Sequence, residues 1–274
     1  MPIGFRIQPT EWGTHESQVK RARGTVCFGA LAAHFRTDSP KLIEWRADRR
    51  APYNKSGDPS LSNKYLRWRQ GTALPNDETV AHIRARTAGA VNLDFWRDLP
   101  LWPLLAPEAP RMSWILRMLE KSPVNIRQIL FGGEDGRWGG RFHHAKPTRV
   151  QLLGIRNLYS LDAFLALLCL ARKGEELEDD PLHFLSSACA FDIFPRILYS
   201  YPPLRYRWEG LFICIERLFW NRVYLNGIYY KFPIEVIRDN LRELDLDPST
   251  CLPQMSGSRI RPARDSATGP DVSA

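Results

Sequence analysis

The chain has 274 residues, 44% of them hydrophobic, which is enough to bury a full core without disulfide or metal staples. Five cysteines are scattered without a CxxC pair, and this odd number favours reduced thiols over a disulfide framework. The net charge is +8, but residues 1–75 hold 13 Lys and Arg against 6 Asp and Glu, a local net charge of +7. A basic segment joined to a nearly neutral one is typical of a module that contacts phosphates, followed by a domain with a different function.

Targeting and membrane signals are not recognised. The first residues, MPIGFRIQPTEWGTHESQ, lack a basic stretch followed by an apolar run, which is the pattern of a signal peptide. The most apolar run, residues 161–171, is too short to cross a bilayer and contains Asp162. We therefore expect a soluble, cytoplasmic protein with no membrane partner.

Along the chain, the first predicted elements are two short helices between two loops. Residues 1–24 are polar with weak periodicity, and residues 52–62 are rich in turn formers, so both are predicted as loop or arm. Between them, a tight turn is expected to separate two helices, the second capped by Asp38 or Ser39.

Each of these two helices has an apolar face. Leu31, Ala32 and Phe35 share one face of the first helix, and Leu42 with Trp45 form the face of the second. Because the apolar face of a surface helix turns toward the core, the pattern predicts that these residues pack inward.

The next helix is predicted from Leu61, because Leu61, Tyr65 and Trp68 recur at i, i+4 and i+7 and form a single apolar stripe. The opposite face carries four polar residues: Asn63, Lys64, Arg67 and Gln70. Gly71 can end this helix in the left-handed conformation, and Leu74 can pack back onto it.

Pro75 followed by Asn76 then indicates the start of another helix with a good cap. Its inner face is predicted to carry Val80, Ile83 and Thr87.

Residues 92–112 combine aromatic residues with four prolines, which breaks helical periodicity and indicates an irregular connector at a domain boundary. The fold class predicted is mostly α. The expected parts are a helix-turn-helix-like N-terminal module at 1–91, the connector at 92–111, a larger α-helical C-terminal domain at 112–246 and a disordered C-terminal tail at 247–274. Within the larger domain, helices are predicted at 112–121, 148–173, 182–199, 208–226 and 233–245, with a glycine-rich loop between the first two.

Two windows within residues 28–90 carry parts of a known pattern. Trp68, Gly71 and Pro75 have the spacing with which a recognition helix commonly ends in the lambda-repressor-like (Xre-type) helix-turn-helix family, and residues 76–79 fit the cap that follows. The chain therefore resembles this family over at most a third of its length.

The second window, residues 31–52, resembles the front half of the same motif through the apolar residues named above and through Pro52, seven residues after Trp45. Arg36 and Asp48 stand there in place of the family's glycines. Either window, 31–52 or 61–87, could contain the reading helix.

The resemblance implies a DNA-binding protein similar to a transcriptional regulator, with a short basic helix that reads the sequence. The expected DNA-contacting residues are Asn63, Lys64, Arg67, Arg69, Gln70, Arg46, Arg49 and Arg50. Arg67 and Gln70, with Asn63 and Lys64, would face the major groove, where Arg reads guanine and Asn or Gln reads adenine. Arg46, Arg49 and Arg50 crowd a helix end beside a loop, which suits phosphate contacts.

An enzymatic alternative rests on the glycine-rich segment 132–144, which contains two acids and two histidines: Glu134, Asp135, His143 and His144. Its glycine spacing fits neither a phosphate-binding P-loop nor a dinucleotide fingerprint, and adjacent histidines on an extended segment point to opposite sides. We therefore predict no catalytic residue, no metal site and no cofactor, and the sequence favours a protein that is not an enzyme.

A third interpretation is a non-enzymatic partner-binding protein, such as an accessory factor of a mobile element. Residues 201–233 are unusually rich in aromatic side chains, which fill cores but are also enriched at protein interfaces. This segment is therefore the candidate surface for homo-oligomer formation.

Overall fold

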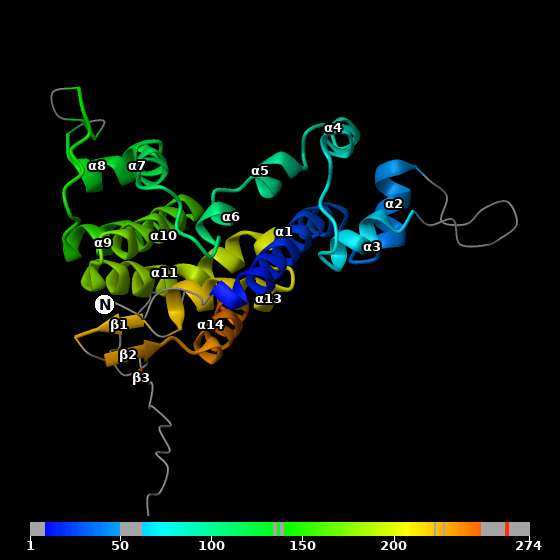
Figure 1. The fold of residues 1–274 in the computed structure, drawn as a ribbon. Coiled ribbons are helices and arrows are strands. Elements are labelled where there is room, and N and C mark those ends of the chain that lie inside the picture. Colours follow the sequence, from blue (N-terminus) through cyan, green and yellow to red (C-terminus); the bar gives the residue numbers. More distant parts are fainter. Residues whose placement is uncertain are drawn as a thin grey trace, which may run out of the picture.

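The computed structural model describes residues 9–49, 62–133, 136–137, 140–221, 223–226, 228–247 and 261–262 of the chain. The fold over these residues is mostly α-helical, as predicted (Figure 1). The N-terminal helices are α1 (Trp12–Phe35), α2 (Pro40–Asp48), α3 (Lys64–Arg69) and α4 (Asp77–Arg86), after a 3₁₀ turn η1 (Pro9–Glu11). The connector contains α5 (Leu93–Arg97) and α6 (Leu101–Leu104).

The second half is also helical, with a small antiparallel sheet near its end. Its helices are α7 (Met112–Glu120), α8 (Val124–Phe131), α9 (Arg149–Arg156), α10 (Leu161–Glu176), α11 (Asp180–Ser200), α12 (Pro202–Arg205), α13 (Trp208–Ile215), the π-helical turn η2 (Glu216–Trp220) and α14 (Ile234–Leu246). The sheet has the order β1 (Val223–Leu225), β2 (Ile228–Lys231) and β3 (Arg261–Pro262). The predicted disordered tail lies outside the described residues except for Asp247 and β3.

Helix α1 corrects the prediction that residues 1–24 form a loop, because the chain is helical from Trp12 onward. The helix packs against α3 and α5 and also against α12 and α13. A helix covered on several sides has no single apolar stripe, so its sequence shows little periodicity. Gly24 and Gly29 belong to these contacts, since a Cβ on Gly29 would lie 2.8 Å from the carbonyl oxygen of Pro203.

Two hydrophobic clusters meet along α1. The smaller cluster gathers α1 to α5 around Phe28, Tyr65 and Trp68. The larger cluster surrounds the α10–α11 hairpin, and Ala22 and Val26 of α1 belong to it. The N-terminal helices are therefore attached to the rest of the chain by a helix that contributes to both cores.

Several predicted helix boundaries in the second half are wrong. The helix predicted at 148–173 is split into α9 and α10, because Tyr159 adopts a left-handed conformation (φ 47°) and Ser160 caps α10 by accepting a hydrogen bond from Ala163. The helix predicted at 208–226 ends in η2 and is followed by β1. Helix α8 and the sheet were not predicted, whereas α7, α11 and α14 lie where helices were expected.

A buried polar cluster fastens the end of the connector to α1 and α10. The side chain of Arg172 is fully buried, and its guanidinium donates to the carbonyl oxygens of Leu104 (3.0 Å) and Ala106 and to the Glu175 carboxylate (2.6 Å). His15 forms a hydrogen bond of 2.8 Å with the carbonyl oxygen of Leu105. Burial lowers the pKa of His15, which keeps its ring neutral in the interior.

Four of the five cysteines are buried free thiols, namely Cys27, Cys169, Cys189 and Cys214. Burial raises the pKa of each to about 12, so these thiols stay protonated and unreactive. The prediction that Cys169, Cys189 and Cys214 belong to the core is confirmed.

Candidate nucleic-acid interface

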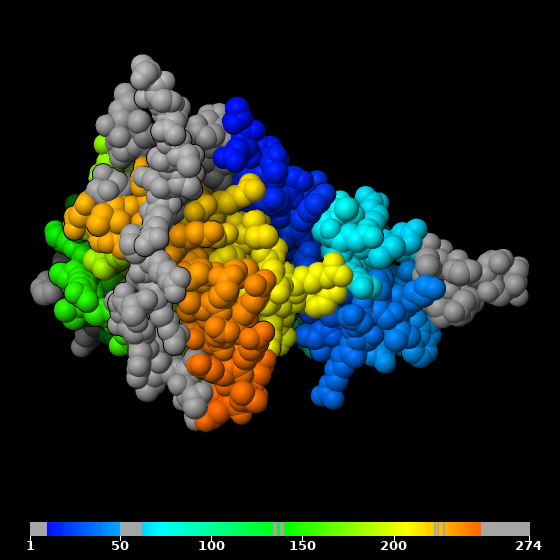
Figure 2. Space-filling model, turned by 90° about the horizontal axis from the view of Figure 1, so that it is seen from below, coloured from blue at the N-terminus to red at the C-terminus, as the bar shows by residue number. Residues whose placement is uncertain are grey.

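Helices α2 and α3 form one end of the molecule, away from α7 to α9 at the opposite end (Figure 1). In the space-filling view, the blue and cyan atoms of the N-terminal helices lie beside yellow atoms near the α11–α12 junction (Figure 2). Two of the elements that carry the predicted DNA-contacting residues therefore share one region of the surface.

The prediction that Leu42 and Trp45 pack inward is wrong. Their side chains are 42% and 51% exposed, whereas Ile43, Glu44 and Ala47 are buried. Both stripes have helical spacing, and a rotation of the helix by about 150° exchanges one for the other. Contacts with α1 and α3 select the Ile43 and Ala47 stripe, so the second helix of the 31–52 window does not pack as predicted. Leu31 and Ala32 in the first helix are buried, as expected.

The turn between α1 and α2 agrees in part with the prediction. Arg36 takes the left-handed conformation (φ 50°) where the resembled family has a glycine. Ser39 occupies the N-cap position of α2 without a side-chain cap, and its backbone N–H donates to Thr37 Oγ1 at 3.2 Å. At the other end of α2, Arg49 rather than Asp48 is left-handed (φ 52°).

Helix α3 has the two-sided character that its sequence predicts. Tyr65 and Trp68 are buried and meet edge to face with ring centroids 5.1 Å apart. Arg67 and Gln70 are exposed, as is Asn63 at the N-cap. The predicted apolar position Leu61 lies outside the described residues.

The predicted left-handed Gly71 and the predicted Asn76 cap after α3 are both confirmed. Gly71 is left-handed (φ 69°), and a Cβ at this position would lie 2.4 Å from the carbonyl oxygen of Arg21. Asn76 caps α4 by accepting a hydrogen bond of 3.0 Å from the backbone of Thr79. The three residues predicted for the inner face of α4 are buried: Val80, Ile83 and Thr87.

Asp48 joins α2, α3 and α4. Its carboxylate accepts a hydrogen bond of 2.8 Å from the Tyr65 hydroxyl, pairs with Lys64 Nζ at 2.9 Å and lies 3.4 Å from His82 Nε2. Burial and the nearby Asp48 charge raise the pKa of Tyr65, so the hydroxyl stays a donor. Lys64 is therefore held against Asp48 at the inner edge of α3.

Among the predicted phosphate-contacting residues, Arg46 lies on α2 and Arg49 is the C-cap residue that follows it. Arg46 is exposed, and its guanidinium donates to the carbonyl oxygen of Phe35. Arg49 is also exposed, while Arg50 lies outside the described residues. Arg69 is half-buried and lines a hollow of about 380 Å³ between α2 and α3.

Of the alternative enzymatic site, the structure describes the two histidines. His143 is exposed, whereas His144 Nε2 lies 2.7 Å from the Glu120 carboxylate and its ring packs against Phe131. Glu134 and Asp135 lie outside the described residues. Among the residues that are described, no group of three or more His, Cys, Asp or Glu could hold a metal ion.

The aromatic segment 201–233 faces largely inward. Phe212 packs against Trp220 with centroids 5.3 Å apart, and Trp220 donates to the carbonyl oxygen of Ser187. These rings stabilise the larger core. Self-association through this segment stays a prediction, for which Ile213 and Ile228 offer exposed apolar side chains.

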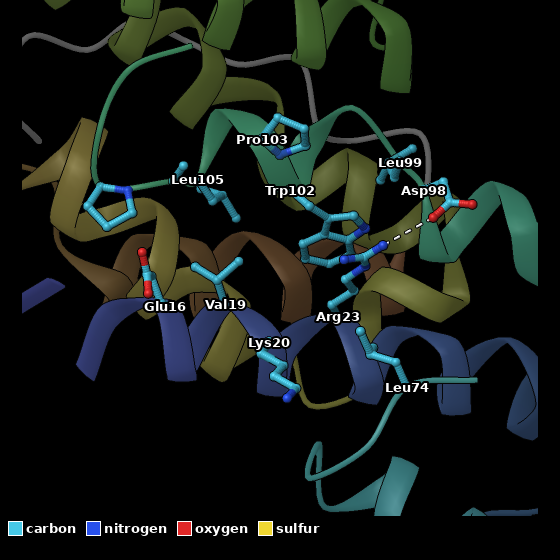
Figure 3. Close-up of a pocket in the computed structure, with 12 residues that line it drawn as sticks. Glu16, Val19, Lys20, Arg23, Leu74, Asp98, Leu99, Trp102, Pro103 and Leu105 are labelled. Atoms are coloured by element: carbon cyan, nitrogen blue, oxygen red, sulfur yellow. Dashed lines mark hydrogen bonds and ion pairs between the residues drawn. The ribbon is translucent and has the colours of Figure 1, made fainter. Parts of the chain in front are cut away.

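A groove of about 660 Å³ between α1 and the connector was not foreseen from the sequence (Figure 3). Trp102 lies along it, and the indole nitrogen of Trp102 donates to the carbonyl oxygen of Trp96. At one end Arg23 pairs with Asp98 at 3.1 Å, so these two rim charges satisfy each other. The lining residues come from α1, the connector and Leu74, which are too far apart in sequence to form a motif.

No protein-family model, no curated protein and no solved structure matches this chain. In the part of the chain that the structure describes, the helices are all too short or too polar to cross a membrane.

Proposed function

We propose that this chain binds double-stranded DNA and reads its sequence with the exposed side of α3, as a transcriptional regulator would. The observation that carries this proposal is the division of α3 into a buried side, with Tyr65 and Trp68, and an exposed side, with Arg67 and Gln70. Because the two aromatic rings fix the rotation of the helix, its polar side chains extend into solvent together.

The exposed residues of α3 have the chemistry that base reading needs. Arg67 can donate two hydrogen bonds to guanine O6 and N7, and Gln70 can pair with adenine N6 and N7. Such bidentate contacts discriminate between bases by roughly 1–3 kcal/mol each. Asn63, exposed at the start of the helix, offers a third amide for an adenine.

The neighbouring cations would supply contacts with the DNA backbone. Arg46 is exposed on α2, which packs beside α3, and Arg49 is exposed at the C-cap of α2. Lys64 and Arg69 are half-buried beside the exposed side of α3. Arg50 keeps the phosphate role expected from its sequence position. Contacts of this kind position the protein without specifying a sequence, and their contribution falls steeply with salt concentration.

The test starts with selection of a duplex from a random library by the full-length protein, followed by binding assays at several salt concentrations. Replacing both Arg67 and Gln70 with alanine is expected to weaken binding to the selected duplex by at least roughly 30-fold, since two base contacts are lost. The free energy of unfolding should change by less than about 0.5 kcal/mol, because both side chains are exposed.

Arg242→Ala provides the matched control, since Arg242 is an exposed arginine on α14. This variant should bind the selected duplex like the wild type. Unchanged affinity of the Arg67→Ala, Gln70→Ala variant would remove α3 as the reading element.

A further inference from the structure

The outer face of α2 carries an exposed tryptophan among cations. At 100° per residue, Lys41, Leu42, Trp45 and Arg46 fall within an arc of about 140°, and Arg49 follows α2 as its C-cap residue. All five of these residues are exposed. Among the tryptophans in the described ranges, Trp45 alone is exposed.

The acids of α2 lie off this face. Glu44 is buried, and its carboxylate accepts a hydrogen bond of 3.1 Å from the backbone of Ser62. Asp48 is turned toward α3, where it pairs with Lys64. The outer face of α2 is therefore basic, with a flat apolar ring at its centre.

We infer that this face binds an unpaired segment of nucleic acid, with the Trp45 indole stacked on a base and the cations on the flanking phosphates. An indole offers a stacking surface to any base, and nearby lysine and arginine side chains hold the backbone. A base inside a duplex is already stacked on both sides, so Trp45 can stack only on a base that is unpaired or extruded.

The position of α2 links this inference to the proposed function, on which it rests. Asp48 at the end of α2 contacts both Lys64 (2.9 Å) and Tyr65 (2.8 Å) of α3. A strand that leaves a duplex held by α3 can therefore continue over α2. The preferred target would be a duplex next to a single-stranded segment.

A protein partner is the competing occupant, since tryptophan and arginine are also enriched at protein interfaces. The charge of the face favours nucleic acid. Lys41, Arg46 and Arg49 surround Trp45, and neither acid of the helix accompanies them. Self-association through Trp45 and Leu42 is one outcome of the test.

The experiment uses full-length protein and three probes built on the selected duplex: a blunt duplex, the same duplex with a short single-stranded extension, and one in which that extension is fully paired. Wild-type protein is expected to bind the probe with the unpaired extension roughly 10-fold more tightly than the other two. Trp45→Ala should abolish this preference and leave binding to the blunt duplex unchanged, while Trp45→Phe retains part of it.

Val150→Ala is the control variant, because Val150 is an exposed apolar residue on α9. It should keep the full preference. An independent readout is tryptophan emission: the unpaired extension should quench emission of the wild type more than that of Trp45→Phe.

The inference is overturned if the wild type shows no preference for the unpaired extension, or if Trp45→Ala retains the preference. It is also overturned if Trp45→Ala converts an oligomer to a monomer in light scattering, which would make this face a protein interface. Failure of the proposed function has a different signature, because the Arg67→Ala, Gln70→Ala variant would then bind the blunt duplex like the wild type. Absence of binding to every probe overturns both.

Discussion

Arg172 in α10 and Arg67 in α3 show how differently the two halves of the molecule use the same side chain. Arg172 has no solvent exposure and donates to two backbone carbonyls and to Glu175. Arg67 is exposed, and within the described residues its side chain forms no ion pair. The buried cation is committed to the fold, whereas the exposed one is available to a partner. Arginine content alone therefore does not locate a binding surface.

The largest effect that sharpens this comparison should come from Arg172→Ala. The substitution leaves Glu175 as a buried charge without this partner, and the carbonyl oxygens of Leu104 and Ala106 lose their donors. We expect a loss of roughly 3–5 kcal/mol in the free energy of unfolding, measured by urea denaturation. Replacing both members of the pair with apolar residues, Arg172→Met with Glu175→Leu, should cost less. If Arg172→Ala lowered the free energy of unfolding no more than Arg67→Ala, the contrast between the buried and the exposed arginine would not hold.

A smaller effect is expected where the turn after α3 lies against α1. Gly71→Ala combines a left-handed conformation with a Cβ that would lie 2.4 Å from the carbonyl oxygen of Arg21. We expect a loss of roughly 2–4 kcal/mol and weaker DNA binding. Gly89→Ala is the matched control, because Gly89 is also left-handed (φ 80°) but has open space around it. Its cost should be about 1–2 kcal/mol. An equal loss of stability in the two variants would show that the contact between residue 71 and the carbonyl oxygen of Arg21 does not limit the side chain at this position.

The smallest effect concerns pH. Burial raises the pKa of Asp192 to about 6, against the opposing influence of Arg156 3.5 Å away. Because the folded state prefers the protonated carboxyl, lowering the pH from about 6 to about 4 stabilises the wild type through this residue. Burial also lowers the pKa of His183 to about 4, so the same change of pH destabilises the protein as the unfolded histidine gains a proton.

The two contributions therefore oppose each other in the wild type. The Asp192→Asn variant lacks the stabilising contribution of the Asp192 carboxyl. Its free energy of unfolding should therefore fall more steeply than that of the wild type as the pH is lowered from 6 to 4. The expected difference between the two profiles is about 1–3 kcal/mol across this range, measured by denaturation at a series of pH values. Parallel profiles would show that Asp192 titrates as an exposed carboxylate does.

Local signals predicted the α3 region well. The Tyr65 and Trp68 stripe, the left-handed Gly71 and the Asn76 cap each depend on a few neighbouring residues, and each is present in the structure. Such features could be predicted because hydrophobic spacing and backbone preference act within one or two helical turns.

Features decided by tertiary packing could not be predicted. Helix α1 contacts elements from both halves of the chain, so its apolar residues do not follow one stripe. In α2, the Leu42 and Trp45 pair and the Ile43 and Ala47 pair satisfy the helical period equally. Only the contacts with α1 and α3 decide which pair is buried, and the exposed Trp45 could not be distinguished from a core residue by spacing.

The sharing of α1 between the two hydrophobic clusters limits how the molecule can be dissected. A fragment that ends at residue 91 would keep the whole helix but lose α12 and α13, leaving Ala22, Val26 and Gly29 open to water. At 1.5 Å per residue the 24 residues of α1 span about 36 Å, so the fragment would expose a long apolar surface to solvent. A fragment limited to the N-terminal module is therefore expected to aggregate.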